Sequence, residues 1–175
     1  MAKIDPLAAP TASGARYPAP FDQPCRNRTW RRLGEAAGLT QFGVNLVRLP
    51  AGVWSSQRHW HSHEDEFVYM LRGEVVLVTD DGEETLRAGE CAGFRAGVRN
   101  GHCFQNRSPK DAELLVVGSR HDDDHGEYPD IDLALAPGAI RARVASGTRT
   151  ERPTSQRSAR LPWAQFSLKS GMTML

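Results

Sequence analysis

Short segments with an extended pattern, four to nine residues long, follow one another through the middle of the chain. They cover residues 42–49, 53–61, 67–71, 75–78, 84–87, 91–95 and 112–118. Turn residues separate them at Leu49-Pro50-Ala51-Gly52 and at Asp80-Asp81-Gly82, and the second of these has the composition of a hairpin turn. No helical period of about ten residues interrupts the series. The pattern therefore predicts an antiparallel all-β barrel or sandwich.

The two ends of the chain differ in composition from this middle. Residues 1–24 contain five prolines among alanines and glycines, which predicts an extended or disordered arm. A short helical turn is expected within 27–38. Residues 138–160 carry six arginines and one acidic residue among small polar residues, as flexible segments do. We expect an N-terminal arm over 1–38, a β-domain over 39–135 and a partly flexible extension over 136–175.

The overall charge argues against two classes of partner. The 175 residues include 22 basic and 21 acidic side chains, for a formal net charge of +1. This balance creates no strong field toward nucleic acid or an anionic membrane. The chain contains no apolar window of about 18 residues, and its start lacks the apolar core of a secretory signal. We expect neither a nucleic-acid partner nor a membrane partner.

The cysteines indicate the redox environment. Cys25, Cys91 and Cys103 are odd in number, and their spacing matches no disulfide or zinc framework. A reducing cytoplasm is the simplest location. Each cysteine is predicted to be a small, buried apolar side chain.

Candidate chemistry gathers in one run. Three of the six histidines lie in His59-Trp60-His61-Ser62-His63, and Glu66 follows closely. In a strand, residues two apart share a face, so two imidazoles on the inner face of a barrel can reach one ion. Imidazole nitrogens and a carboxylate oxygen suit zinc, iron, manganese, nickel or cobalt. Such a set leaves coordination positions open for chemistry, whereas a His-x-His pair alone is more often surface or core polarity.

The wider frame of this run resembles the first sequence motif of the cupin superfamily. In that motif a glycine precedes a His-x-His pair, and a glutamate and a closing glycine follow it. The matching residues are Gly52, His59, His61, Glu66 and Gly73. The step from the first glycine to the first histidine is one residue longer than usual.

The second cupin motif is matched with two departures. The residues in its order are Gly89, Gly97, His102 and Asn106. Arg95 stands where proline is usual, and His102 lies five residues after Gly97 instead of three, so that Asn100 takes the usual place. Asn100 and His102 share a strand parity, and either could face the ion. His102 keeps the family's spacing to Asn106, which favours His102.

The resemblance covers residues 41–120 and is strongest to stand-alone, single-domain bacterial cupins. It implies a jelly-roll-like antiparallel cupin β-barrel with an irregular N-terminal arm and a C-terminal extension. It also implies one divalent transition-metal ion (Fe, Mn, Ni, Co or Zn), a small-molecule ligand or substrate, and a homodimer. The implied metal ligands are His59, His61, Glu66 and His102.

Two classes of function fit these expectations. The first is a metal-dependent enzyme acting on a small polar organic molecule by oxygenation, decarboxylation, isomerisation or lyase chemistry. The second is a non-catalytic protein that binds or senses a small molecule through its metal. No helix-turn-helix or other output domain is visible in the sequence, which weakens a direct transcriptional role.

Neighbouring polar residues receive simpler interpretations. We expect Glu64 and Asp65 to face outward or to lie in a turn, and the acidic run 121–125 to form a solvated loop. The catalytic residues are unknown. Three residues stay open as a general acid or base, namely Tyr69, His63 and Arg95.

Overall fold

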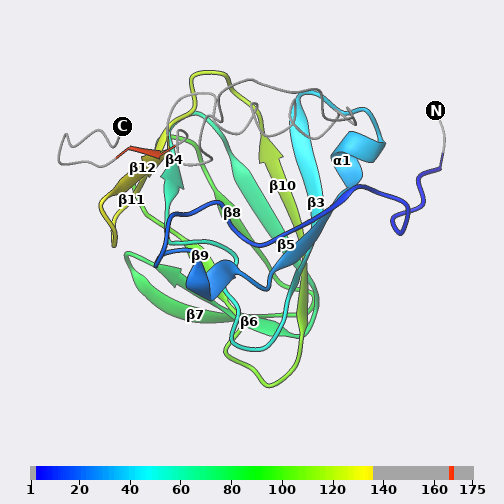
Figure 1. Cartoon of the computed structure of the whole chain (residues 1–175), viewed down its shortest axis with the longest axis horizontal. Helices are drawn as coiled ribbons and strands as arrows, with labels where there is room; N and C mark the ends of the chain where they lie inside the picture. The colour runs from blue at the N-terminus through cyan, green and yellow to red at the C-terminus, as the bar shows by residue number, and fades with distance from the viewer. Residues whose placement is uncertain (1–2, 136–165, 168–175) are drawn as a thin grey trace, which may run out of the picture.

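Strands account for nearly all regular structure in the computed structural model, which describes residues 3–135 and 166–167 (Figure 1). Two single-turn helical elements, η1 (Gln23–Cys25) and α1 (Leu33–Ala36), are the exceptions among these residues. The strands are β1 (Thr11–Ser13), β2 (Thr29–Arg32), β3 (Phe42–Leu49), β4 (Trp60–His61), β5 (Glu66–Arg72), β6 (Glu74–Thr79), β7 (Gly82–Arg87), β8 (Cys91–Phe94), β9 (Cys103–Gln105), β10 (Ala112–Ser119), β11 (Gly126–Tyr128), β12 (Leu133–Leu135) and β13 (Phe166–Ser167). Every pairing between them is antiparallel. The all-β prediction is confirmed.

The strands form three sheets that enclose one interior. The largest sheet has the order β1-β2-β3-β10-β5-β8, and the two smaller ones have the orders β7-β6-β9 and β13-β12-β11-β4. Figure 1 shows β3, β10 and β5 side by side, with β6 and β7 below them and β4, β11 and β12 to their left. Strands that are neighbours in space are often distant in sequence, as in a jelly-roll-like barrel.

The apolar core lies where β3 ends and β10 begins. Ala112 pairs there with Leu49, and Leu114 pairs with Met70 of β5. Because strand side chains alternate between faces, these residues all point into the barrel. The buried core consists of Leu49, Val53, Val68, Met70, Val75, Leu86, Phe104, Ala112 and Leu114.

The opposite ends of the same strands carry small and charged residues inside the barrel. Gly118 of β10 is the partner of Gly43 on one side and of Glu66 on the other. All three have the inward parity of Leu114. The interior is therefore filled at one end and open at the other.

The N-terminal region contributes strands to the large sheet. β2 pairs with β3 from Thr29 to Arg32, and β1 pairs with β2. The helical turn predicted within 27–38 is thus only partly right, because β2 takes a third of that segment and helix is confined to α1. β2 forms because the edge of β3 that is not paired with β10 offers free backbone hydrogen-bonding groups. The local sequence of β2 does not reveal this partner. The domain boundaries at 38 and 135 stay a prediction, and nearly all of the extension lies outside the described residues.

Both predicted turns are present. β6 and β7 form a hairpin in which Thr79 pairs with Gly82, leaving two aspartates as the loop. The amide of Val53 donates to the carbonyl of Pro50, and Gly52 has a φ of 77°, a left-handed conformation that glycine adopts readily.

Cys25 and Cys103 are buried as predicted, but Cys91 is exposed. Cys91 pairs with Tyr69 on the outer face of the sheet, while Ala92 and Phe94 take the inner positions of β8. The prediction for Cys91 was wrong because the alternation of β8 places this residue outward. No helix among the described residues is long and apolar enough to span a membrane.

Candidate metal centre

Backbone pairing fixes the direction of His59 and His61. His61 pairs with Gly126 of β11, and His59 forms an isolated bridge with His102. In that bridge the amide of each histidine donates to the carbonyl of the other, at 3.1 and 2.8 Å. Trp60 is buried between them. Since residues two apart point the same way, the two imidazoles project together, with ring centroids 4.9 Å apart.

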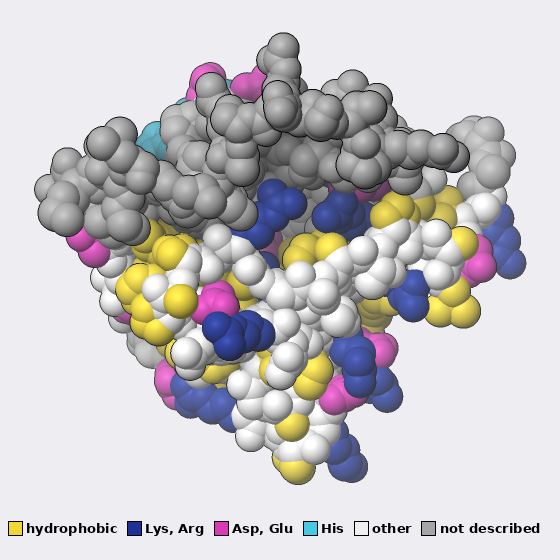
Figure 2. Space-filling view, in the orientation of Figure 1, with side chains coloured by type: hydrophobic (Ala, Val, Ile, Leu, Met, Phe, Trp, Pro, Cys, Tyr) yellow, Lys and Arg dark blue, Asp and Glu magenta, His cyan; other side chains and the backbone are white. Residues whose placement is uncertain are grey.

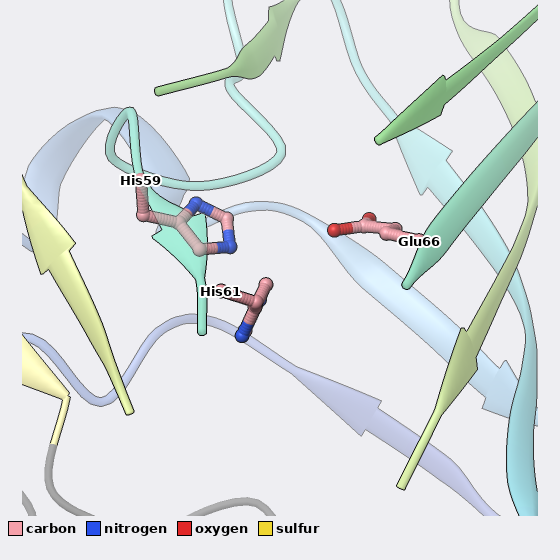
Figure 3. Close-up of side chains that lie close together, drawn as sticks. All are labelled: His59, His61 and Glu66. Atoms are coloured by element: carbon pink, nitrogen blue, oxygen red, sulfur yellow. The ribbon is translucent and has the colours of Figure 1, made fainter. Parts of the chain in front are cut away.

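Glu66, the first residue of β5, faces these imidazoles across the interior. One nitrogen of His59, one nitrogen of His61 and one carboxylate oxygen of Glu66 all lie within 4.8 Å of one another. Figure 3 shows the imidazole of His59 and the carboxylate of Glu66 pointing toward the same space. The structure thus brings together three of the four predicted ligands in a group that could hold a metal ion.

His102 lies directly beside this group. Its Nε2 is 3.1 Å from Oε2 of Glu66, and its ring stacks on Phe94 at a centroid distance of 3.5 Å. Asn100 is engaged elsewhere, because its amide accepts from the backbone of Asp80 and donates to Asp81 in the β6–β7 turn. These contacts support His102 over Asn100, and its role as a ligand stays a prediction.

The hydrogen bonds of the two leading imidazoles fit a metal ion. Nδ1 of His59 lies 3.0 Å from the carbonyl of Gln57, and Nδ1 of His61 lies 2.8 Å from Oδ2 of Asp124. A carbonyl or an ionised carboxylate can only accept, so each Nδ1 carries the hydrogen. When the ring is neutral, Nε2 then presents a lone pair, which is the tautomer that a metal-binding histidine needs.

The charge states of His59 and Glu66 suit the same role, whereas for His61 burial is outweighed by the hydrogen bond to Asp124 and the nearby carboxylates, which raise the pKa. Burial, together with the neighbouring His61 and His102, lowers the pKa of His59 to about 3, which keeps this ring neutral. Burial opposes ionisation of Glu66, but the hydrogen bond from His102 and the nearby imidazoles outweigh it and bring its pKa to about 2. Neutral imidazole and ionised carboxylate are the forms that bind metal ions.

Asp124 is a positioning residue that the sequence reasoning missed. Its side chain is buried, and its Oδ1 accepts the amides of His63 and Glu64 at 2.8 and 3.1 Å. Burial opposes its ionisation, but these bonds and the one to His61 lower its pKa overall. The solvated-loop expectation holds for the exposed Asp122 and Asp123 and was wrong for Asp124. Nothing in the run distinguishes the third aspartate until β11 pairs with β4.

Glu64 also corrects an expectation. It was expected to face outward or to lie in a turn. It does lie where the chain turns, but its side chain is buried, and its Oε1 accepts the amide of His121 at 2.9 Å. The chain bends between β4 and β5, which turns Glu64 inward and leaves Asp65 exposed. Burial raises the pKa of Glu64.

The three residues left open as a general acid or base lie in different surroundings. Tyr69 is 38% exposed on the outer face of the sheet, and His63 is exposed at the bend. Arg95 borders a cavity of about 320 Å³ together with His61 and His102. None of the three borders the neighbouring cavity of about 290 Å³, whose wall includes His59, His61, Glu64 and Glu66.

The chain is similar to proteins of known family and known structure. Residues 45–118 match the Cupin domain family. A sugar phosphate isomerase from a cupin superfamily, from Silicibacter pomeroyi, is 37% identical with a TM-score of 0.78, and the match covers 99% of this chain and 97% of that one. A candidate sugar phosphate isomerase from Acidithiobacillus ferrooxidans is 29% identical with a TM-score of 0.61, over 64% of this chain and 72% of that one.

A predicted oxalate decarboxylase from Thermotoga maritima is 20% identical with a TM-score of 0.54, over 69% of this chain and 100% of that one. That similarity concerns the fold alone. No curated protein matches the chain in sequence.

Proposed function

The chain belongs to the cupin superfamily, and from its candidate site we propose that it is a metal-dependent enzyme acting on a small polar organic molecule. Within this class we propose isomerisation of a phosphorylated sugar, the activity named for the Silicibacter pomeroyi relative. The observation that supports an enzyme is the placement of His59, His61 and Glu66 at the wall of a cavity large enough for a small molecule. A homodimer in the cytoplasm belongs to the same proposal.

In this proposal His59, His61, Glu66 and His102 hold one divalent ion. When bound, such an ion polarises a carbonyl or hydroxyl oxygen of the substrate as a Lewis acid. The chain's own groups prepare the site. Gln57 and Asp124 fix the two imidazoles through Nδ1, and the stacked ring of Phe94 holds His102 beside Glu66.

Turnover by metal-loaded protein tests the proposal. We expect protein reconstituted in turn with Fe, Mn, Ni, Co and Zn to interconvert an aldose phosphate and a ketose phosphate, followed by NMR over a panel of pentose and hexose phosphates. His59→Ala should abolish both metal retention and turnover. His63→Ala is the matched control, because His63 lies four residues away and is exposed. Metal-loaded protein that binds these compounds without converting them would make the protein a non-catalytic binder.

A further inference from the structure

Three arginines border the same cavity as three of the proposed metal ligands, His59, His61 and Glu66. The arginines are Arg28, Arg32 and Arg120. Arg32 ends β2 and is paired with Asn45, whose inward parity it shares. Arg120 directly follows β10 and has the parity of Gly118. Figure 2 shows basic side chains gathered in a hollow on the face that carries β10 and α1.

These arginines are held in place mainly by backbone and ring contacts. Arg120 donates from Nη1 to the carbonyl of Leu39 at 3.2 Å. Arg28 donates from Nε to the carbonyl of Gly14 at 2.8 Å, and its guanidinium lies 5.0 Å from the centre of the Trp30 ring. Such contacts orient a guanidinium without neutralising it.

Carboxylate partners are scarce around this group. Arg32 has one, Glu35, at 3.4 Å. Among the described residues, no carboxylate lies within 4.0 Å of Arg28 or Arg120. By contrast, Arg48 and Arg72 pair with Asp111 and Glu113 at 2.5 and 2.8 Å. The cavity arginines thus keep positive charge and N–H donors available to an anion.

Two paired glycines leave room beside these donors. Gly43 faces Gly118, and Gly118 faces Glu66. A Cβ added at Gly43 would lie 3.6 Å from Nη2 of Arg120 and 3.8 Å from Nδ2 of Asn45, in ordinary contact with both. The missing side chains keep the path between Arg120 and Glu66 free of bulk.

We propose that Arg28, Arg32 and Arg120 bind the phosphate of the substrate, while the sugar's reacting oxygens lie toward His59, His61 and Glu66. A phosphate dianion leaving water requires several charged donors, and guanidinium groups match its geometry. The cavity wall also contains Glu35, Glu64, Asp65 and Glu66, which repel a phosphate, so the three guanidinium groups are the permanently charged donors in this wall that can hold one. This inference rests on the proposed function and adds a recognition element to it.

Binding measurements on the full chain test the assignment. We expect calorimetry to show that ribose 5-phosphate binds far more tightly than ribose, and that inorganic phosphate competes with it. Arg120→Ala and Arg32→Ala should each weaken ribose 5-phosphate binding at least tenfold, and Arg120→Lys should retain part of it. Gly43→Ala should also weaken binding, because the added methyl group occupies the open path without strain. Arg48→Ala and Arg72→Ala are the controls, with arginines on exposed, carboxylate-paired positions.

The outcomes separate this inference from the proposed function. Loss of binding in Arg120→Ala with far-UV circular dichroism unchanged supports the phosphate site, even if no sugar phosphate is converted. Equal affinities in Arg120→Ala and Arg48→Ala would overturn it, even if wild-type protein is an isomerase. Tight binding of malonate in place of phosphate would also overturn it, because the arginines would then serve a carboxylate.

Discussion

The inner face of β5 changes character along one strand: Glu66 lies beside the histidines, and Met70 lies in the apolar core. β10 repeats the change, from Gly118 opposite Glu66 to Leu114 opposite Met70. The same ladder of backbone hydrogen bonds thus supports a packed end and an end that keeps open space. Changes at the packed end should cost folding stability, and changes at the open end should cost binding.

The largest effect is expected in the core. Met70→Ala should lower the free energy of unfolding by about 3 kcal/mol, because a fully buried side chain is lost and a cavity remains. Urea unfolding of metal-free protein measures it. Tyr69→Ala, the adjacent residue on the exposed outer face, should cost clearly less. Equal losses would mean that the outer face is covered and packed as well.

Metal affinity should respond most to Glu66. Glu66→Gln removes the negative charge and should weaken divalent-metal binding about a hundredfold, or ~2.7 kcal/mol. Competition with a chromogenic chelator measures the affinity. Asp65→Asn is the control, since this neighbouring carboxylate is exposed and lies outside the group formed by His59, His61 and Glu66. A similar loss in both variants would indicate a general charge effect and no specific ligand.

A residue at the open end, His59, should also make the stability of the metal-free protein fall as the pH is lowered. Folding lowers the pKa of His59 from 6.5 to about 3. Between these two pH values the His59 imidazole is therefore protonated in the unfolded chain and neutral in the folded chain. Metal-free protein should therefore lose about 2 kcal/mol of stability between pH 6.5 and 4.5 through this residue. His61 adds no such loss, because its raised pKa leaves it protonated in both states well below pH 6.5.

Urea unfolding across this pH range checks the prediction. His59→Ala should show a shallower slope of stability against pH, whereas Met70→Ala should keep the wild-type slope. Parallel slopes for His59→Ala and wild type would show that protonation of this ring does not limit the fold.

The smallest effect tests His102 against Asn100. His102→Ala should weaken metal binding at least tenfold, ~1.4 kcal/mol, because its Nε2 contacts Glu66 and imidazole binds these ions far better than an amide. Asn100→Ala should cost much less, since its amide serves the β6–β7 turn. Chelator competition decides between them, and the reverse order would move the ion toward Asn100.

The strands were predictable because their signals are local. Alternation along 42–49 and the aspartate turn before Gly82 specify strand and hairpin without help from the rest of the chain. His59, His61 and Glu66 could be selected because the motif places them within eight residues. β2 could not be found this way, since Thr29–Arg32 becomes a strand only through its pairing with β3.

The supporting residues depend on distant contacts. Asp124 meets His61 across 63 positions, and Arg32 and Arg120 come to the cavity from opposite sides of the large sheet's centre. The shared strand parity of Asn100 and His102 could not decide which of them faces the ion. The structure distinguishes them, because the side-chain amide of Asn100 is hydrogen-bonded to the β6–β7 turn. The sequence motifs identify the residues proposed to bind an ion. The residues that position those side chains become visible only in the folded structure.

The bridge between His59 and His102 has a consequence for how an ion arrives. These residues lie far apart in sequence, yet their backbones are hydrogen-bonded to each other in both directions. If these two residues bind an ion as proposed, the ion meets rings whose main chain is already ordered, and its capture requires little further ordering of the polypeptide. Exchange of one ion for another can proceed without refolding. Under the proposed function, the ion held at equilibrium would then be decided by the donor set and by the ions available to the folded protein.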